Sequence, residues 1–244
     1  PDAVRPAGEG RPPPRLRMPL PRALLLALAL TGPAVAETAV PLANLVIPPD
    51  QAVAGLPLSD YATLWWQWAF SMPQGESPIV DETGTLCAVG QSGPVWFLAG
   101  GYGSSRIHRS CEVPAGRYLF FPVINVVQML YPTTVADCPA LQAEAAANND
   151  TYVYLKVLLD GEALDSPERF RLASTTCFDP FARSPASATA PQDALAATDG
   201  YWIMLQPLPA GPHLLEFRAF YTNPDEALGD MVQNIAYNLT IRSD

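Results

Sequence analysis

Basic side chains are scarce in this sequence, and histidine is almost missing. The 244 residues include 24 Asp and Glu against 14 Lys and Arg, and Lys156 is the single lysine. Residues 37–244 hold nine basic and 22 acidic side chains, a net charge of about −13. Such a surface repels the phosphates of nucleic acids and of anionic membranes. With His108 and His213 as the two histidines, a histidine-rich zinc site is not expected.

An apolar run long enough to span a bilayer, about 20 residues, is missing too. The run at residues 23–30 is much shorter; Arg22 precedes it, and the small-x-small sequence Ala-Val-Ala follows at residues 34–36. A positive start, a short apolar centre and a small-residue cleavage site are the three parts of a secretory signal peptide. We therefore predict a signal peptide over residues 18–36.

The segment before this signal, residues 1–17, is rich in Pro, Gly and Arg, a composition that buries no core. We interpret it as upstream translation ahead of the true start at Met18. The mature protein is then expected to begin at Glu37, to be secreted or periplasmic, and to make no membrane contact after cleavage.

Cysteine occurs four times, and the Cys-x-x-Cys spacing of metal sites is missing. The Gly-x-Ser-x-Gly, His-Glu-x-x-His and P-loop motifs are missing as well. An even number of cysteines behind an export signal indicates two disulfides, with three possible pairings. We favour Cys87–Cys111, which would bracket an apolar strand, and Cys138–Cys177.

Apolar periodicity predicts one helix followed by many strands. Residues 61, 64, 65, 68 and 69 form one apolar stripe of an amphipathic helix, capped by Ser59 and ended by Pro73. The later apolar segments are short, and several are continuous, as in strands covered on both faces. The predicted strands lie at 95–99, 118–127, 151–159, 170–173, 201–205, 214–221 and 235–241.

These strands, separated by Pro- and Gly-rich turns, predict a single all-β domain over residues 37–244. We expect a jelly-roll-like β-sandwich with the N-terminal amphipathic helix and one short helix inserted at 139–147. The pair Asp160-Gly161 is a strong hairpin signal, and 170–173 is the candidate partner of the strand that it ends.

Five motifs follow one another in the first half of this domain: Trp65-x-x-Trp68-x-x-Ser71-x-Pro73, Asp81-x-Thr83-Gly84-x-x-Cys87, Gly93-Pro-Val-Trp-Phe-Leu98, Arg109-x-Cys111-x-Val113-Pro-x-Gly116 and Phe121-Pro122-x-x-Asn125. Together they resemble a group of secreted bacterial proteins of unknown function. The resemblance covers most of the domain. It implies an exported β-sandwich and supplies neither a reaction nor site residues.

Acidic side chains give the first candidate site. Asp81 and Glu82 lie in a loop near a predicted disulfide, and Asp225 and Asp230 lie in a loop between two strands. Carboxylates on loops suit Ca²⁺, which takes about six to eight oxygen ligands, although solvated acidic loops have the same composition. We predict Ca²⁺ as the candidate cofactor, held by these four residues. In an enzyme, Asp81 or His108 would act as the catalytic base.

Polar and aromatic side chains give a second candidate site. Arg109 is expected either to pair with an acidic neighbour, Asp81 or Glu112, or to bind a ligand. Asn125 interrupts an apolar run, either at a bulge or at the mouth of a concave site. Trp66 and Trp202 are candidates for an exposed platform on which a glycan stacks, although aromatic residues in strands usually belong to the core.

We therefore predict an exported β-sandwich with a concave site that binds a neutral small molecule or glycan, with Ca²⁺ as a candidate cofactor. The alternative is a calcium-dependent hydrolase of small esters or lactones. A third hypothesis is a structural envelope or matrix protein. The first two require Asp81, His108, Arg109 and Asn125 to converge in one cleft, whereas the third predicts that they are dispersed and internally satisfied.

Overall fold

The structure is a computed structural model that describes residues 40–103, 106–130, 137–185, 193–222 and 229–243. The predicted signal peptide and the segment before it lie outside these ranges. Residues 39–244 cluster in one compact unit. Within the described ranges, no helix is long and apolar enough to cross a membrane.

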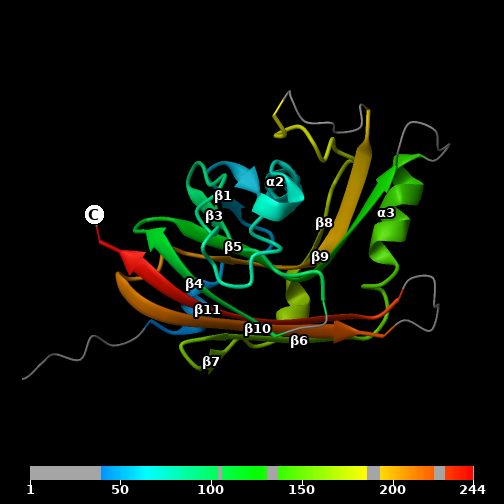
Figure 1. Ribbon diagram of the computed structural model, residues 1–244. Coiled ribbons are helices and arrows are strands. Elements are labelled where there is room, and N and C mark those ends of the chain that lie inside the picture. The colour runs from blue at the N-terminus through cyan, green and yellow to red at the C-terminus, as the bar shows by residue number, and fades with distance from the viewer. Residues whose placement is uncertain (1–39, 104–105, 131–136, 186–192, 223–228, 244) are drawn as a thin grey trace, which may run out of the picture. The chain divides into compact units, whose positions relative to one another are not determined.

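Two β-sheets form a sandwich, and a small two-stranded sheet lies beside it (Figure 1). The five-stranded sheet has the order β4-β11-β10-β6-β7, and the four-stranded sheet has the order β3-β5-β9-β8. The first contains β4 (Ile107–Pro114), β6 (Val153–Leu159), β7 (Glu162–Ala163), β10 (Gly211–Tyr221) and β11 (Met231–Arg242). The second contains β3 (Val95–Phe97), β5 (Tyr118–Leu130), β8 (Arg171–Ala173) and β9 (Leu195–Leu205). The small sheet pairs β1 (Ala52–Val53) with β2 (Leu56–Pro57).

Three α-helices accompany the sheets: α1 (Leu42–Leu45), α2 (Leu58–Phe70) and α3 (Cys138–Ala146). Two 3₁₀ turns, η1 (Gln74–Glu76) and η2 (Pro167–Phe170), complete the elements. Helix α2 begins one residue before the predicted cap Ser59. Helix α3 is capped by Asp137, whose carboxylate accepts a hydrogen bond from the backbone N–H of Ala140 at 3.0 Å.

The strand order is that of a sandwich but does not meet the jelly-roll pattern. Strand β4 runs parallel to β11, and β3 runs parallel to β5, whereas jelly rolls are antiparallel double sheets. The turns before β5 and β10 carry the chain from one sheet to the other, so they are sandwich corners rather than hairpins.

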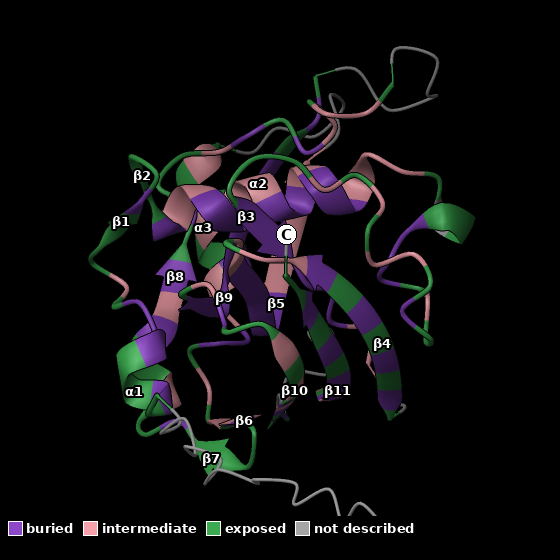
Figure 2. Cartoon of the chain, turned by 90° about the vertical axis from the view of Figure 1, so that its left-hand side faces the viewer, coloured by how far each residue is buried: buried purple, intermediate pink, exposed green. Residues whose placement is uncertain are grey.

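The four-stranded sheet is buried on both faces, which explains its continuous apolar runs. On its inner face, Phe121 of β5 stacks on Phe217 of β10 with ring centroids 5.0 Å apart. On its outer face, α2 packs Trp65 against Trp202 of β9. The five-stranded sheet has one wet face, and the alternation of buried and exposed residues is plain along β4 (Figure 2).

One strand was not predicted, and one predicted strand pairing is wrong. Strand β4 was not predicted, because its inward positions include Arg109 and Cys111 rather than a run of aliphatic residues. The segment 170–173 does not pair with β6: β8 joins the four-stranded sheet beside β9, and β7 is the hairpin partner of β6. The predicted turn is present between β6 and β7, with Asp160 and Gly161 both at positive φ.

Both predicted disulfides are confirmed. Cys87–Cys111 links the segment before β3 to β4, and Cys138–Cys177 ties the start of α3 to the segment after β8. Their Cα–Cα distances of 5.9 and 5.7 Å lie in the ordinary range. Two disulfides agree with folding in an oxidising compartment.

Residues 42–49, which we name the strap, extend the four-stranded sheet along β9. Val46 forms a β-bridge with Leu205, and the backbone N–H of Ile47 donates to the carbonyl of Met204 at 2.8 Å. Because Leu205 also pairs with β5, the strap lies on the opposite edge of β9, the edge that β8 covers further along. The strap thus protects an edge that would otherwise expose unpaired backbone groups.

Candidate functional site

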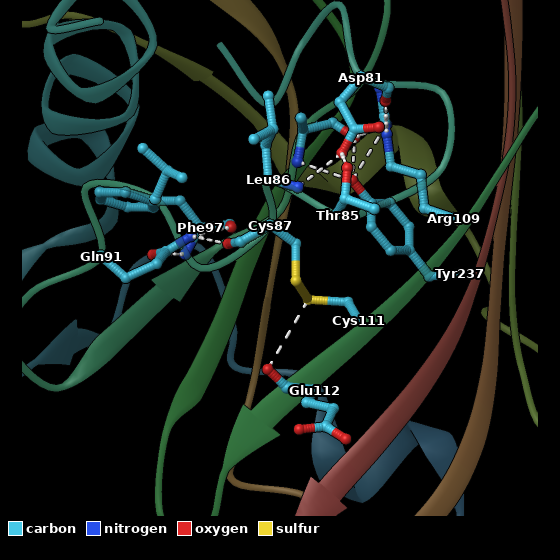
Figure 3. Close-up of a disulfide and its surroundings, with 12 residues drawn as sticks. Asp81, Thr85, Leu86, Cys87, Gln91, Phe97, Arg109, Cys111, Glu112 and Tyr237 are labelled. Atoms are coloured by element: carbon cyan, nitrogen blue, oxygen red, sulfur yellow. Dashed lines mark hydrogen bonds between the residues drawn. A yellow bond between two sulfur atoms is a disulfide. The ribbon is translucent and has the colours of Figure 1, made fainter. Parts of the chain in front are cut away.

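Asp81 lies in a loop that covers the free edge of β4. The backbone N–H of Ser110 in β4 donates to the carbonyl of Thr83 at 2.9 Å. Gly84 has a φ of +90°, and a Cβ at this position would overlap the carbonyl oxygen of Ser110. Only glycine therefore fits the approach of the two backbones. The Cys87–Cys111 disulfide fastens the same loop to the strand (Figure 3).

The carboxylate of Asp81 organises this loop. One oxygen accepts from the backbone N–H and the hydroxyl of Thr83, at 2.8 and 2.7 Å, and the other accepts from the N–H of Leu86 at 2.8 Å (Figure 3). Partial burial acts to raise the pKa of Asp81, but these donors outweigh it and the pKa is lowered. Asp81 is thus kept ionised by its own loop, with both oxygens already engaged.

Arg109 is one of the largest fully buried side chains, only 1% exposed. Its guanidinium donates to the carbonyls of Asp81, Ala99 and Ile79, at 2.5, 2.8 and 3.1 Å, and to the hydroxyl of Tyr237 at 3.0 Å. It also lies over the Tyr237 ring, 5.4 Å from the centroid.

The partners of Arg109 differ from those predicted. It binds the backbone of Asp81 rather than the carboxylate, and Glu112 pairs instead with Arg242 at 2.9 Å. Its donors are directed at protein carbonyls, and the space beside it is too narrow for water. All the observed hydrogen bonds of the guanidinium are internal, so in this structure Arg109 acts as a structural clamp.

His108 and Asn125 do not join this cluster. His108 neighbours Arg109 on β4, so its exposed side chain points to the opposite face of the sheet. Asn125 lies on the four-stranded sheet, and its neighbours Ile124 and Val126 pack into the core between the sheets, so Asn125 faces the other way.

Asn125 follows a bulge that lies between Pro122 and Ile124, and strand β5 continues through it. Its Nδ2 is buried without a hydrogen-bond partner within the described residues. Opposite it, Gly200 leaves the space that the asparagine fills, since a Cβ there would lie 2.6 Å from the Asn125 Cβ. Asp81 and Arg109 lie together, but His108 and Asn125 lie elsewhere on the sandwich. These residues therefore do not form the single cleft that both the binding and the hydrolase hypotheses required.

Trp66 and Trp202 do not form an exposed platform. Trp66 is 7% exposed and its indole N–H donates to the hydroxyl of Thr198 at 2.8 Å. Trp202 is fully buried and stacks on Phe120 at 5.3 Å. Trp66 belongs to α2 itself, and the same helix packs Trp65 against Trp202, so both indoles take part in core packing.

Three of the four predicted calcium ligands lie in the part of the chain that the structure describes. Glu82 is exposed in the loop of Asp81, Asp230 lies just before β11, and Asp225 lies outside the described residues. Among the described residues, no group of three or more His, Cys, Asp or Glu side chains is arranged to hold a metal ion.

A concavity of about 380 Å³ lies elsewhere, between the strap and the segment that follows β7. Its buried wall is formed by Val46 of the strap, Leu164 and Phe170. Asp50, Asp165 and Arg169 line its exposed side, together with Ala43, Pro48 and Pro49. Cavities of roughly 300–1,000 Å³ with apolar walls and a few polar groups are typical of small-molecule sites.

Local sequence explains how this concavity forms. The β6–β7 hairpin delivers Leu164 to the core, Ser166 adopts a left-handed conformation, and Pro167 starts the short turn η2. This turn positions the Arg169 guanidinium over the ring of Phe170, 5.6 Å from its centroid. Sequence reasoning missed the site because its residues come from two distant segments and belong to no motif.

A second group missed by sequence reasoning is a buried ion pair at the end of α3. Asp199 of β9 accepts from Arg171 of β8 and from the amide of Asn149, both at 2.9 Å, and Arg171 also contacts Asp150 at 2.7 Å. Burial raises the pKa of Asp199 and outweighs the opposing effect of Arg171. The network joins α3 to the four-stranded sheet.

Comparisons of the chain with protein-family models, with curated proteins and with solved structures found no match. The chemistry of the site therefore has to be argued from its own residues.

Proposed function

We propose that the protein is an exported binding protein, and that the concavity beside the strap holds a neutral small molecule or one unit of a neutral glycan. The observation that carries this proposal is the 380 Å³ concavity with an apolar wall and three charged side chains along its exposed side. Export is supported by the signal-like N-terminal sequence and by the two disulfides.

The side chains of the concavity favour a ligand with an apolar face and several hydroxyl groups. Val46, Leu164 and Phe170 can cover the apolar face of such a ligand. The carboxylates of Asp50 and Asp165 can accept hydrogen bonds from hydroxyls, and Arg169 can donate to a ring or carbonyl oxygen. Two carboxylates against one guanidinium disfavour an anion in this site.

The residues that were expected to form one cleft do not converge, so the binding proposal rests on the concavity beside the strap alone. A hydrolase that uses Asp81 or His108 would need them at one reacting centre, but Asp81 is engaged by its loop and His108 lies on the wet face of the sheet. A purely structural role fits the internal hydrogen bonds of Asp81 and Arg109, yet it leaves the concavity unexplained.

Filling the concavity tests the proposal. Ala43→Trp adds a large side chain at its exposed lining, and Asn44→Trp adds the same side chain one residue later, away from the lining. A panel of neutral methyl glycosides, small alcohols and lactones would be titrated into the labelled protein. We expect amide shifts around Val46 and Leu164 that vanish in Ala43→Trp and persist in Asn44→Trp. Shifts absent from this region with every compound would contradict the proposal.

A further inference from the structure

The wet face of the five-stranded sheet carries two adjacent rows of unlike chemistry. Phe220 of β10 pairs with Tyr154 of β6 on one side and with Val232 of β11 on the other, which makes an apolar row across three strands. Two residues further along each strand, the register aligns Lys156, Arg218 and Asn234 in a cationic and amide row. Residues two apart on a strand share a face, so the rows are neighbours.

The apolar row is exposed to an unusual degree. Phe220 is 41% exposed and Val232 47%, and Tyr152, just before β6, is 77% exposed. The rings of Tyr154 and Phe220 stack 5.1 Å apart, which fixes them as one rigid unit. Such a concentration of large apolar side chains on a wet sheet face marks a surface that another molecule can cover.

The cationic row is equally unusual for this chain. Lys156, the only lysine, stands directly opposite Arg218 in a protein with a net charge of −10. Like charges directly opposite each other across two strands are destabilising. Arg218 has a loose contact with Glu216 at 3.5 Å, and Lys156 has no ion-pair partner among the described residues. An anion between the two cations would relieve this repulsion.

We infer that these two rows bind a sugar acid within a glycan, a unit with one carboxylate on a pyranose ring. The carboxylate lies between the Lys156 ammonium and the Arg218 guanidinium, and Asn234 reaches a neighbouring hydroxyl. The C–H face of the sugar ring packs against Phe220 and Val232. This face is apolar, and its weakly positive hydrogens are attracted to the negative face of an aromatic ring. This site differs in place and in charge from the concavity beside the strap.

The surroundings of the patch favour an isolated carboxylate over a polyanion. Glu216 is the next residue on the same face of β10, so a ligand with closely spaced phosphates would meet a carboxylate directly beyond Arg218. The acidic surface as a whole repels nucleic acid in the same way. A second copy of the chain is also disfavoured, since a symmetric contact of this patch would bring two cationic rows together.

The test compares the methyl glycoside of galacturonic acid, which carries one carboxylate, with the methyl ester of the same compound, which keeps the ring and removes the charge. Binding is followed by amide shifts and by calorimetry at low and at physiological salt. We expect the acid to bind and shift the amides of β6, β10 and β11, more weakly at higher salt, and the ester to bind at least tenfold more weakly. Lys156→Gln and Arg218→Gln should each weaken binding about fivefold, the upper range for an exposed ion pair.

Further variants distinguish binding at this patch from non-specific effects of charge and from binding at the strap. Arg242→Gln removes an exposed arginine at the far end of β11, next to Glu112, and should leave binding unchanged. Phe220→Ser should fold normally, because the side chain is largely exposed, and should lose binding. Ala43→Trp should have no effect, so failure of the strap site and failure of this one are distinguishable.

Several results would overturn the inference. These are no binding of the acid at millimolar concentration, equal binding of acid and ester, or binding that survives Lys156→Gln with Arg218→Gln. Tighter association with vesicles containing phosphatidylglycerol, lost in the same variants, would assign the patch to a lipid surface instead. Self-association of the chain that Phe220→Ser abolishes would assign it to a second copy.

Discussion

The guanidinium of Arg109 and the hydroxyl of Tyr237 lie 3.0 Å apart in the protein interior, and both donate to the carbonyl of Ala99. The hydroxyl also accepts from the N–H of Ala99, so all of its hydrogen-bonding capacity is used. Burial raises the pKa of Tyr237 and outweighs the lowering effect of Arg109, so the phenol stays neutral. A buried cation is held here by oxygen dipoles: within the described residues, its hydrogen-bond acceptors are three carbonyls and one hydroxyl.

Removing this cation should be costly. Arg109→Met keeps much of the side-chain volume but leaves the carbonyls of Asp81 and Ile79 without the guanidinium donors and removes one of the two donors to the carbonyl of Ala99. We expect the free energy of unfolding to fall by about 3–5 kcal/mol, because several buried acceptors lose their partners together. Urea unfolding measures the loss. Arg106→Met, at an exposed site just before β4, is the matched control and should change stability by less than about 0.5 kcal/mol.

Gly84 offers a comparison of two glycines with nearly the same backbone conformation. Gly84 and Gly55 have φ values of +90° and +85°, but the site of Gly55 is open, whereas a Cβ on Gly84 meets the backbone of Ser110. We expect Gly55→Ala to cost about 1 kcal/mol from backbone strain alone. Gly84→Ala should cost about 3 kcal/mol and lower the yield of the Cys87–Cys111 disulfide, as measured by thiol labelling. An equal loss of unfolding free energy in the two variants would show that the loop does not pack closely against β4.

The ionised carboxylate of Asp81 should stabilise the folded protein, and this stabilisation should be lost at low pH. Its pKa is lowered in the folded state, so its contribution is complete above the ordinary pKa and is lost as the pH falls through the folded-state pKa. The difference in unfolding free energy between the wild type and Asp81→Asn should therefore shrink as the pH falls from 7 towards 3. Urea titrations at several pH values measure it, and a constant difference would contradict this account.

The contribution of Asp199 to stability should depend on pH in the opposite direction. Burial raises its folded-state pKa, so protonation favours the folded protein, and stability is lost as the pH rises through that pKa. Relative to Asp199→Asn, the wild type should gain stability as the pH falls from neutral towards the ordinary carboxyl pKa. The same titrations report it. Because Asp81 and Asp199 lie in separate networks, their effects should add in the double variant.

Sequence patterns predicted the parts of the fold in which local chemistry and burial agree. The strands of the four-stranded sheet appear as apolar runs because Trp202 and Phe120 are covered by α2 and their neighbours face the second sheet. The disulfide pairing was predictable because Cys87 and Cys111 bracket one strand. Strand β4 was missed because a buried arginine occupies one of its inward positions, which a polarity pattern interprets as solvent-facing.

The candidate site could not be predicted in the same way. Asp81, Arg109 and Trp66 were selected because they are polar or aromatic residues in otherwise ordinary segments. In the structure, each of them makes its hydrogen bonds inside the protein. The concavity beside the strap depends on Val46 and Leu164 meeting across the fold, and both are ordinary aliphatic residues. The site is formed by the way the chain brings distant segments together, which residue types alone do not indicate.

The strap also sets an order for folding. It joins residues far apart in the chain: the amide of Gln206 donates to the carbonyl of Asn44, 162 positions away. Contacts of such long sequence separation form slowly, because a large loop must close before they are gained. A ribosome-bound chain lacking β9 would have no edge on which to seat residues 42–49. We therefore expect the sandwich to be completed only after the last third of the polypeptide has been made.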